Sequence, residues 1–250
     1  MARLGRLAEG TPLAPELALA GSSWQLQAPI DLFSHWRGLG LATQAAHGRQ
    51  LQLLEPLRPG QTRLRARLVE DGYPGWVELQ ALLGHAVACT PRRPRLLDAS
   101  AISRAIPAVL AYAHQASLQP NHYLWGGSLG PDFDCSGLVQ TAFAAAGIWI
   151  PRDAYQQERF CQPVAVAPGC YSLLRPGDLI FFGKPQRCTH VALYLGGGRY
   201  LHSSGRQHGR DGLGLDGLDP QLSDPVSVHY RQELRGAGRV VRCHDGTTLA

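Results

Sequence analysis

Two different spacings of hydrophobic residues divide the chain. From Trp24 to about Leu83 the apolar runs are short and broken by turn residues, and Arg63–Val69 alternates arginine with apolar side chains. Such alternation predicts half-buried strands, and a series of short strands predicts a small antiparallel barrel. In the second half, Ser100–Ser117 repeats apolar residues at helical spacing around Pro107, which we expect to kink or shorten the helix.

A second helix is predicted to begin at Cys135. Apolar residues after this position recur on one helix face, and Gly147 ends the pattern. Asp132 and Asp134 are short polar residues suited to capping the start. Free backbone N–H groups and the helix dipole favour an anion in the first turn, so we expect the Cys135 thiol to lose its proton easily. The alternative is a buried, inert cysteine beside an ordinary cap.

Three strands are expected after this helix, and they carry two histidines. The strands are Asp178–Phe182, His190–Leu195 and Arg199–Ser204. If Gly196–Gly198 form a hairpin loop, Leu195 pairs with Arg199, and side-chain alternation places His190 and His202 on one sheet face as diagonal neighbours. A loop one residue shorter would place them on opposite faces.

Cys135, His190 and His202 together could form a cysteine nucleophile with a general base and a residue that orients it. With this register, Cys135 can rest against the histidine-bearing face, His190 can take the thiol proton and return it to a leaving amine, and His202 can orient His190. Either histidine could instead be a satisfied structural residue, and the other histidines are interpreted in this way. A zinc site built from Cys135, His190 and His202 is chemically possible, but no further ligand motif accompanies them.

Composition narrows the class of protein. An apolar fraction of 44% supports a real core, and 24 basic against 19 acidic residues give a net charge of +5. The arginines are scattered apart from Arg92, Arg93 and Arg95, without interleaved aromatics, which disfavours nucleic-acid binding. The six cysteines lack metal-binding spacing and are expected to be reduced. Neither a secretory signal nor an apolar run of membrane-spanning length is recognisable, so we expect a cytoplasmic protein without membrane insertion, leaving cell-envelope association open.

Four short motifs follow one another in the second half of the chain. They are Tyr123–Gly127, Asp134–Val139, Leu174–Leu179 and Thr189–Tyr194. Together they resemble the NlpC-type cysteine peptidases, papain-like enzymes that cut cell-wall peptides. Residues 21–83, including Glu70–Trp76, are similar to the bacterial SH3-like domain that precedes the peptidase in γ-D-glutamyl-L-diamino acid endopeptidases.

The resemblance implies an α+β fold, a papain-like cysteine peptidase domain with helices packed on an antiparallel sheet, preceded in the chain by a small SH3-like β-barrel. The expected segments are a poorly structured lead-in (1–20), the barrel (21–90), a linker (91–99), the peptidase domain (100–243) and a tail (244–250). Within the peptidase domain we expect a loop over 205–226 and a final strand over Arg239–Cys243.

The resemblance also implies roles for the catalytic residues. Cys135 is the nucleophile, His190 the base and His202 the third polar residue. Tyr123 corresponds to a tyrosine whose hydroxyl forms the oxyanion hole together with the Cys135 backbone N–H. Trp125 lies in the same motif and is expected to contact the substrate. No cofactor or metal is implied.

The implied substrate resembles L-Ala-γ-D-Glu-diaminopimelate, a peptidoglycan stem peptide with a free amine on the alanine. Asp134 and Ser136 match amine-binding positions beside the nucleophile. Tyr73, with Glu70 or Asp71, would close the same pocket from the barrel.

The free carboxylate of D-Glu has its own expected partner. Arg152 matches the position that holds this carboxylate, a task that suits a guanidinium fork. Some relatives have a serine two residues later, where this chain has Ala154.

The expected function is therefore cleavage of the γ-D-glutamyl–diamino acid bond, in the recycling of wall peptides. Two alternatives stay open at this point. The chain could bind cell-wall peptide without catalysis, or it could act as an amidase or acyltransferase on the same fold.

Overall fold

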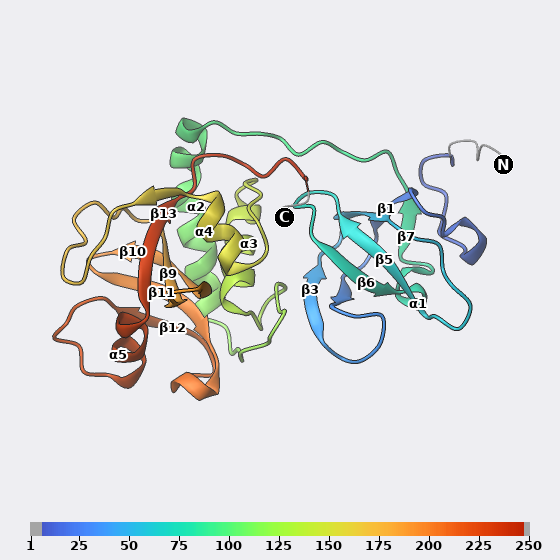
Figure 1. Ribbon diagram of the computed structural model, residues 1–250. Helices are drawn as coiled ribbons and strands as arrows, with labels where there is room; N and C mark the ends of the chain where they lie inside the picture. Colours follow the sequence, from blue (N-terminus) through green and yellow to red (C-terminus); the bar gives the residue numbers. More distant parts are fainter. Residues whose placement is uncertain (1–6, 248–250) are drawn as a thin grey trace. The chain divides into compact units, whose positions relative to one another are not determined.

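The computed structural model describes residues 7–247 (Figure 1). They form two compact units. One is built from residues up to Pro94 and from Asp245 onward, and the other from Arg95–His244. The division falls inside the stretch that the sequence predicts to be a linker.

The first unit is a seven-stranded antiparallel sheet whose strands all contribute to one core. In the order β3-β2-β6-β5-β4-β1-β7, neighbouring strands are hydrogen-bonded, and the fully buried Trp24 lies in the core. The strands are β1 (Ser23–Leu26), β2 (Ile30–Phe33), β3 (Leu41–Ala45), β4 (Gln50–Leu53), β5 (Arg63–Leu68), β6 (Pro74–Glu78) and β7 (Ala86–Ala88), with the short helix α1 (Leu79–Leu82) after β6. Alternating burial along β5 confirms the strand that its alternating arginines predict.

The residues before β1 belong to this unit, so the prediction of a poorly structured lead-in is wrong for them. Leu13 and Ala18 are buried in the barrel core, and the 3-10 helix η1 (Pro15–Leu17) lies between them. Apolar residues separated by prolines show no regular period, which is why sequence reasoning missed this contact. Residues 1–6 of the predicted lead-in and 248–250 of the predicted tail lie outside the described residues.

The second unit is a six-stranded antiparallel sheet with helices on both faces. The strand order is β12-β11-β10-β9-β13-β8. The strands are β8 (Gln162–Val164), β9 (Leu179–Lys184), β10 (Arg187–Gly196), β11 (Arg199–Ser204), β12 (Gly212–Gly217) and β13 (Leu234–Arg239). The helices are α2 (Ala99–Ser117), α3 (Cys135–Ala145), α4 (Ala154–Phe160) and α5 (Pro225–Gln232), with the 3-10 helix η2 (Arg206–His208) before β12. Helices and antiparallel strands in this arrangement confirm the predicted α+β class.

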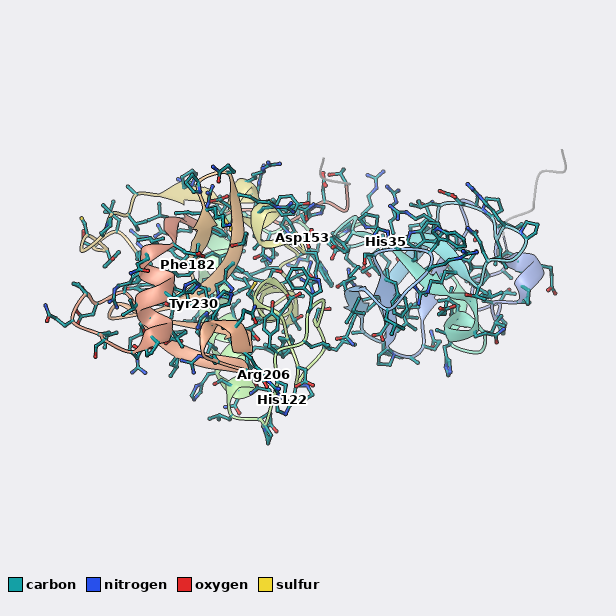
Figure 2. All side chains as sticks on the ribbon, turned by 60° about the horizontal axis from the view of Figure 1, so that its bottom comes forward. His35, His122, Asp153, Phe182, Arg206 and Tyr230 are labelled. Atoms are coloured by element: carbon teal, nitrogen blue, oxygen red, sulfur yellow. The ribbon has the colours of Figure 1, made fainter. Side chains whose placement is uncertain are left out.

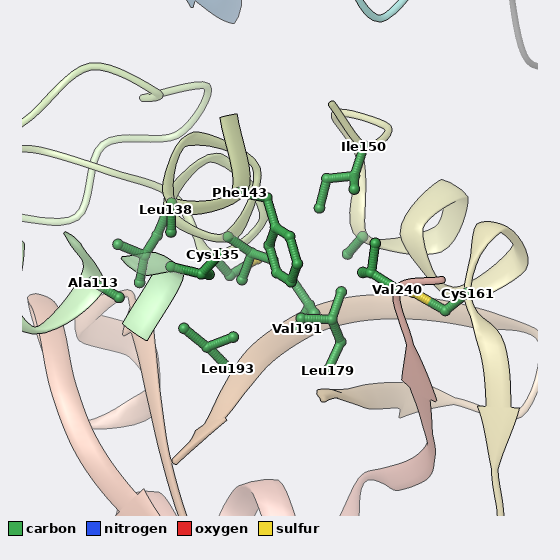
Figure 3. Packing of buried hydrophobic residues seen from close by; sticks show 14 of the residues in the cluster. Ala113, Cys135, Leu138, Phe143, Ile150, Cys161, Leu179, Val191, Leu193 and Val240 are labelled. Carbon is green, nitrogen blue, oxygen red and sulfur yellow. The ribbon is translucent and has the colours of Figure 1, made fainter. Parts of the chain in front are cut away.

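The helices are divided between the two faces of the sheet. On one face, α2, α3 and α4 pack over alternate residues of the central strands, among them Val191 and Leu193 (Figure 3). On the other face, Ala192 and Tyr200 join a second buried cluster with Tyr230 of α5. The two-residue period of β10 therefore sends its side chains into two different cores.

The long helix α2 begins one residue before the predicted Ser100 and continues through Pro107. The Asp98 carboxylate accepts the Ala101 N–H at 2.7 Å, as an N-cap does. The helix still runs to Ser117, because Val109 and Ala113 beyond the proline are fully buried in the core.

The hairpin between β10 and β11 has the predicted register. Leu193 pairs with Leu201 and Tyr194 with Tyr200. The one difference is at the loop, where a bulge pairs Gly196 instead of Leu195 with Arg199.

Three elements near the C-terminus differ from expectation. The predicted loop over 205–226 contains β12, which pairs with β11 along its whole length, and α5 was not predicted. The final strand is β13, which ends at Arg239 instead of beginning there. β12 and β13 are rich in glycine, which has no side chain to show an alternating pattern, so hydrophobicity could not reveal them.

Candidate functional site

The start of α3 is built around Asp134. Its Oδ1 accepts the Gly137 N–H at 2.6 Å, which makes Asp134 the N-cap and confirms the predicted cap. A Cβ on Gly137 would collide with the Gly127 carbonyl, so only glycine lets the preceding loop approach this closely. Asp132, the other predicted cap, instead accepts the His122 N–H at 2.7 Å.

Arg152 is buried against this cap. It is 1% exposed, and its guanidinium donates to both Asp134 oxygens at 3.0 and 2.8 Å and to Ser136 Oγ at 2.9 Å. The structure therefore does not support the predicted contact between Arg152 and the substrate carboxylate, because the guanidinium is enclosed and bonded to the nucleophile helix. Asp134 and Ser136 are buried in the same network, and amine binding by these two residues stays a prediction.

The Cys135 thiol is enclosed by protein. Burial raises its pKa to about 12, the Asp134 charge adds to this, and the N–H groups of Val191 and Ser136 and the charge of Arg152 oppose it. The expectation of an easily ionised thiol is therefore wrong: desolvation outweighs the helix N-terminus. The resting thiol is protonated and needs a base to become a nucleophile.

Cys135 approaches the sheet from a different side than predicted. α3 covers the face that carries Val191, whereas His190 and His202 lie on the opposite face with Tyr230. At the first residue of α3, however, the thiol receives the Val191 N–H, next to His190 in the chain. Burial raises the pKa of Tyr230, and the nearby Cys135 contributes, so the thiol is within electrostatic range of the ring stacked on His190.

The two histidines form the predicted pair. His190 Nε2 and His202 Nδ1 are 2.7 Å apart, and both side chains are buried. Tyr230 stacks on the His190 ring at 4.3 Å between centroids. The Phe182 ring lies against both of these rings, and Figure 2 shows Phe182 next to Tyr230. Because Nε2 is bonded to His202, Nδ1 is the His190 nitrogen that this pair leaves available.

Sequence reasoning missed Asp216, which follows the histidines in the same hydrogen-bond chain. Its Oδ2 is 2.8 Å from His202 Nε2, and its side chain is 2% exposed. Burial by itself raises the Asp216 pKa, but the hydrogen bonds from His202 and Ser227 and the charge of Arg210 outweigh it and leave the pKa below its ordinary value. Strand alternation is the sequence signal that could have found Asp216. Asp216 and His202 point to the same face of an antiparallel pair only if residues 212–217 form a strand.

Tyr123 lies in the loop that leads to α3. Its backbone forms an isolated β-bridge with Phe133, and its N–H donates to Asp211 at 3.1 Å. Asp211 also binds His122 and Arg206, which lie side by side in Figure 2. Burial raises the Tyr123 pKa, and the neighbouring Cys135 and Asp134 add to it, so the hydroxyl stays protonated and able to donate.

The remaining predicted substrate residues lie in the loop before α3 and in the barrel. Trp125 is 74% exposed in the loop before α3. In the barrel, Arg49 pairs with Glu70 at 3.1 Å and with Asp71 at 3.0 Å, and the Tyr73 N–H donates to Asp71. Contact of Trp125, Tyr73, Glu70 and Asp71 with a substrate stays a prediction.

Comparison with known proteins identifies the parts of the chain. Residues 120–232 match the NlpC/P60 family, and residues 37–82 match the bacterial dipeptidyl-peptidase Sh3 domain. Residues 120–232 form an NlpC/P60 domain. Both predicted resemblances are thereby confirmed.

Relatives of the NlpC/P60 domain are named as peptidases. The chain is 37% identical over 123 residues to the bifunctional muramidase/DL-endopeptidase CwlT of Bacillus subtilis (strain 168), which covers 47% of this chain and 32% of that protein. It is 43% identical over 84 residues to the gamma-D-glutamyl-L-lysine dipeptidyl-peptidase of the same strain, covering 32% of this chain and 27% of that protein. The chain thus spans about a third or less of these two relatives.

One solved structure shows the fold of both units. An NlpC/P60 family protein from Bacillus cereus ATCC 10987 matches with a TM-score of 0.64 and 18% identity, covering 88% of this chain and all of that one. The predicted fold, a papain-like domain preceded in the chain by an SH3-like barrel, is confirmed.

Two further properties concern the whole described chain. Among residues 7–247, no three or more His, Cys, Asp or Glu side chains are arranged to hold a metal ion, so the alternative zinc site has no geometric support there. No helix in the same range combines the length and apolar character that crossing a membrane requires.

The buried histidine pair predicts how the stability of the NlpC/P60 domain depends on pH. Burial lowers the His190 pKa well below its ordinary value of 6.5, so the folded state binds this proton more weakly than the unfolded state. The free energy of unfolding should be unaffected by this group above about pH 6.5 and should fall as the pH drops below it, by at most about 1.4 kcal/mol per pH unit. Urea unfolding at several pH values tests this.

The control for the pH experiment is His190→Asn, which removes the titrating group. The variant should show a shallower loss of stability below pH 6.5 than the wild type. Equal slopes in the two proteins would contradict a neutral, buried His190.

Proposed function

We propose that this chain is a cysteine peptidase that cleaves the γ-D-glutamyl–diamino acid bond of cell-wall peptides with a free N-terminal L-alanine. The observation that carries the proposal is the 2.7 Å hydrogen bond between His190 and His202. His190 lies on β10, and the N–H of the next residue, Val191, donates to the Cys135 thiol. A protonated thiol beside an oriented, neutral imidazole is equipped for nucleophilic attack. The names of the relatives support cell-wall peptide as the substrate class.

The first half of the reaction forms a thioester. His190 Nδ1 takes the proton of Cys135 as the sulfur attacks the γ-carbonyl carbon of D-Glu. The carbonyl oxygen becomes an oxyanion, which the Cys135 N–H and the Tyr123 hydroxyl stabilise, with such donors commonly worth about 3 kcal/mol each. When the intermediate collapses, the C–N bond breaks and the same proton passes from His190 to the leaving amine of the diamino acid.

The second half returns the enzyme to its starting state. A water molecule attacks the thioester carbon while His190 takes one of its protons, and the C–S bond breaks. The proton returns to the Cys135 sulfur, and L-Ala-D-Glu leaves with a free γ-carboxylate. His202 orients the His190 ring in both halves through its hydrogen bond to Nε2.

The backbone supplies one part of this machinery without any side chain. Cys135 is the first residue of α3, so its N–H has no carbonyl partner within the helix. That N–H is free to bind the developing charge, and the helix dipole favours an anion there.

The substrate assignment predicts a defined product pattern. Incubation with L-Ala-γ-D-Glu-L-Lys and with L-Ala-γ-D-Glu-diaminopimelate should release L-Ala-D-Glu and the free diamino acid, which mass spectrometry identifies. Acetylating the alanine amine should abolish cleavage, since a pocket shaped for an ammonium leaves polar groups unpaired around an amide.

Each outcome of the product experiment is decisive for one part of the proposal. Cleavage at a different bond would refute the assigned bond specificity. Equal cleavage of free and acetylated peptides would refute the amine pocket while leaving the peptidase chemistry intact. Transfer of the L-Ala-D-Glu group to an added amine in preference to water would favour the acyltransferase alternative.

The cellular setting follows from the substrate. A requirement for a free alanine amine selects peptides already detached from glycan, so we propose a role in recycling such peptides, in the cytoplasm.

A further inference from the structure

A carboxylate stands at the end of the histidine chain, on a segment that the family motifs do not include. Asp216 Oδ2 is 2.8 Å from His202 Nε2, and His202 Nδ1 is 2.7 Å from His190 Nε2. His202 is fully buried, so water cannot substitute for either partner. The three side chains therefore form one continuous path that ends at the base.

The direction of every hydrogen bond in this path follows from its last member. An ionised carboxylate only accepts, so the proton between Asp216 and His202 must be on His202 Nε2. A neutral imidazole with Nε2 protonated has a bare Nδ1, which can only accept. The proton between the two rings is therefore on His190 Nε2, and His190 Nδ1 is left as the lone pair that can receive the thiol proton.

We propose that Asp216 is a positioning residue that selects, through His202, the tautomer of His190 required of a general base. Without this carboxylate, each ring could carry its proton on either nitrogen. The reversed arrangement protonates His190 at Nδ1 and removes its ability to accept the thiol proton. Along this path, His202 and His190 stand between Asp216 and the Cys135 sulfur, so Asp216 touches no reacting atom.

The surroundings hold the carboxylate in this orientation. Ser227 Oγ donates to Oδ1 at 3.1 Å, and Arg210 donates to Oδ2 at 2.7 Å. Ser227 in turn accepts the Gly217 N–H at 3.1 Å and lies in the first turn of α5, capped by Asp224. Oδ1 thus accepts a hydrogen bond from a neutral hydroxyl, and Oδ2 accepts hydrogen bonds from His202 and from the permanently charged Arg210.

Tyr230 fixes the planes of the rings that the path connects. Its ring stacks on His190 at an angle of 25° and meets His202 nearly edge-on at 82°. Its hydroxyl is 2.7 Å from Ser204 Oγ. Because Tyr230 holds the ring planes, only the position of the proton on each ring is still to be set. Asp216 sets it.

The test compares Asp216→Ala with Asp216→Asn, using ¹⁵N-histidine NMR to report which ring nitrogen carries hydrogen. The wild type should show Nε2–H on both His190 and His202, assigned with His190→Asn and His202→Asn. Asp216→Ala should shift part of both populations to Nδ1–H, whereas the asparagine oxygen can still accept from His202 and should preserve the tautomers. Asp219→Asn, an exposed aspartate on the same segment, is the matched control and should change nothing.

Kinetics on the tripeptides provide the second measurement, and this part rests on the proposed function. Loss of the outer hydrogen-bond partner of a metal-bound histidine commonly costs about 10- to 100-fold in activity. We expect a similar factor for this base, so kcat of Asp216→Ala should fall in that range with KM little changed. Asp216→Asn should recover most of this loss. Ser227→Ala, which removes a single bond to Oδ1, should lower kcat by a smaller factor and provides a second variant if Asp216→Ala does not fold.

The two measurements separate the possible failures. Nδ1–H on wild-type His202, or unchanged tautomers in Asp216→Ala, would overturn the proposal whatever the enzyme's substrate. A wild type that cleaves neither tripeptide would refute the proposed function but leave the NMR result to decide the role of Asp216. An equal loss of kcat in the alanine and asparagine variants with unchanged tautomers would show that Asp216 acts by charge alone and would also overturn it.

Discussion

Replacing Cys135 by alanine is expected to abolish cleavage of L-Ala-γ-D-Glu-diamino acid tripeptides. Alanine cannot form the thioester, and loss of the nucleophile in comparable triads costs at least about 10⁴-fold in kcat. The side chain is buried at the start of α3, and the Asp134 cap does not depend on it, so the fold should persist. Initial rates measured by quantitative mass spectrometry, with circular dichroism to confirm folding, provide the test.

The matched control is Cys161→Ala, which removes a thiol of similar burial. Cys161 is 7% exposed against 6% for Cys135, and burial likewise raises its pKa to about 12. It lies at the C-terminal end of α4, so its loss should leave kcat/KM close to the wild-type value. Unchanged cleavage by Cys135→Ala would disprove the peptidase proposal. Retained peptide binding by both variants, without cleavage by the wild type, would establish the non-catalytic alternative.

Replacing Arg152 by methionine is expected to have the largest effect on stability. Arg152 and Asp134 form an ion pair at 2.8 Å, with side-chain exposures of 1% and 11%. Methionine fills much of the same volume but leaves the carboxylate without its cation. Breaking a buried pair from one side typically costs about 3–5 kcal/mol, and chemical denaturation should show a loss of this size.

The double variant Asp134→Asn/Arg152→Met tests whether this loss comes from the unpaired charge. Asparagine caps helices about as well as aspartate and carries no charge, so the double variant should regain part of the stability lost in the single one. Arg152→Lys should be intermediate, because an ammonium cannot bind both carboxylate oxygens as a guanidinium does. A loss below about 1 kcal/mol for Arg152→Met would mean that Asp134 is not dependent on this partner.

Some site features could be predicted because they depend on neighbours in the chain. The cap at Asp134, the end of α3 before Gly147 and the register of the β10–β11 hairpin each follow from a few adjacent residues. That register was enough to bring His190 and His202 together, since alternation along a strand leaves no other choice once the loop is set. Strand β5 could likewise be predicted from its alternating arginines.

Other features were invisible because their partners are distant in the chain. Arg152 was expected to meet a ligand, and its actual partner, Asp134, lies eighteen positions earlier on another element. Asp216 belongs to a glycine-rich strand that offers no hydrophobic pattern, so neither the strand nor its carboxylate could be anticipated. The elevated pKa of Cys135 depends on how much protein surrounds the thiol, which no local motif states.

The two-part organisation, the family resemblance, the nucleophile helix and the pairing of the histidines could all be inferred from the order of residues. These depend on periodicity, caps and turn lengths, which are local properties. Three features emerge only when the chain is folded: the face of the sheet that α3 covers, the partner of Arg152, and the buried carboxylate that completes the histidine chain. Those outcomes are set by desolvation and by contacts across the core, where the energy of a group depends on what encloses it and not on its neighbours in sequence.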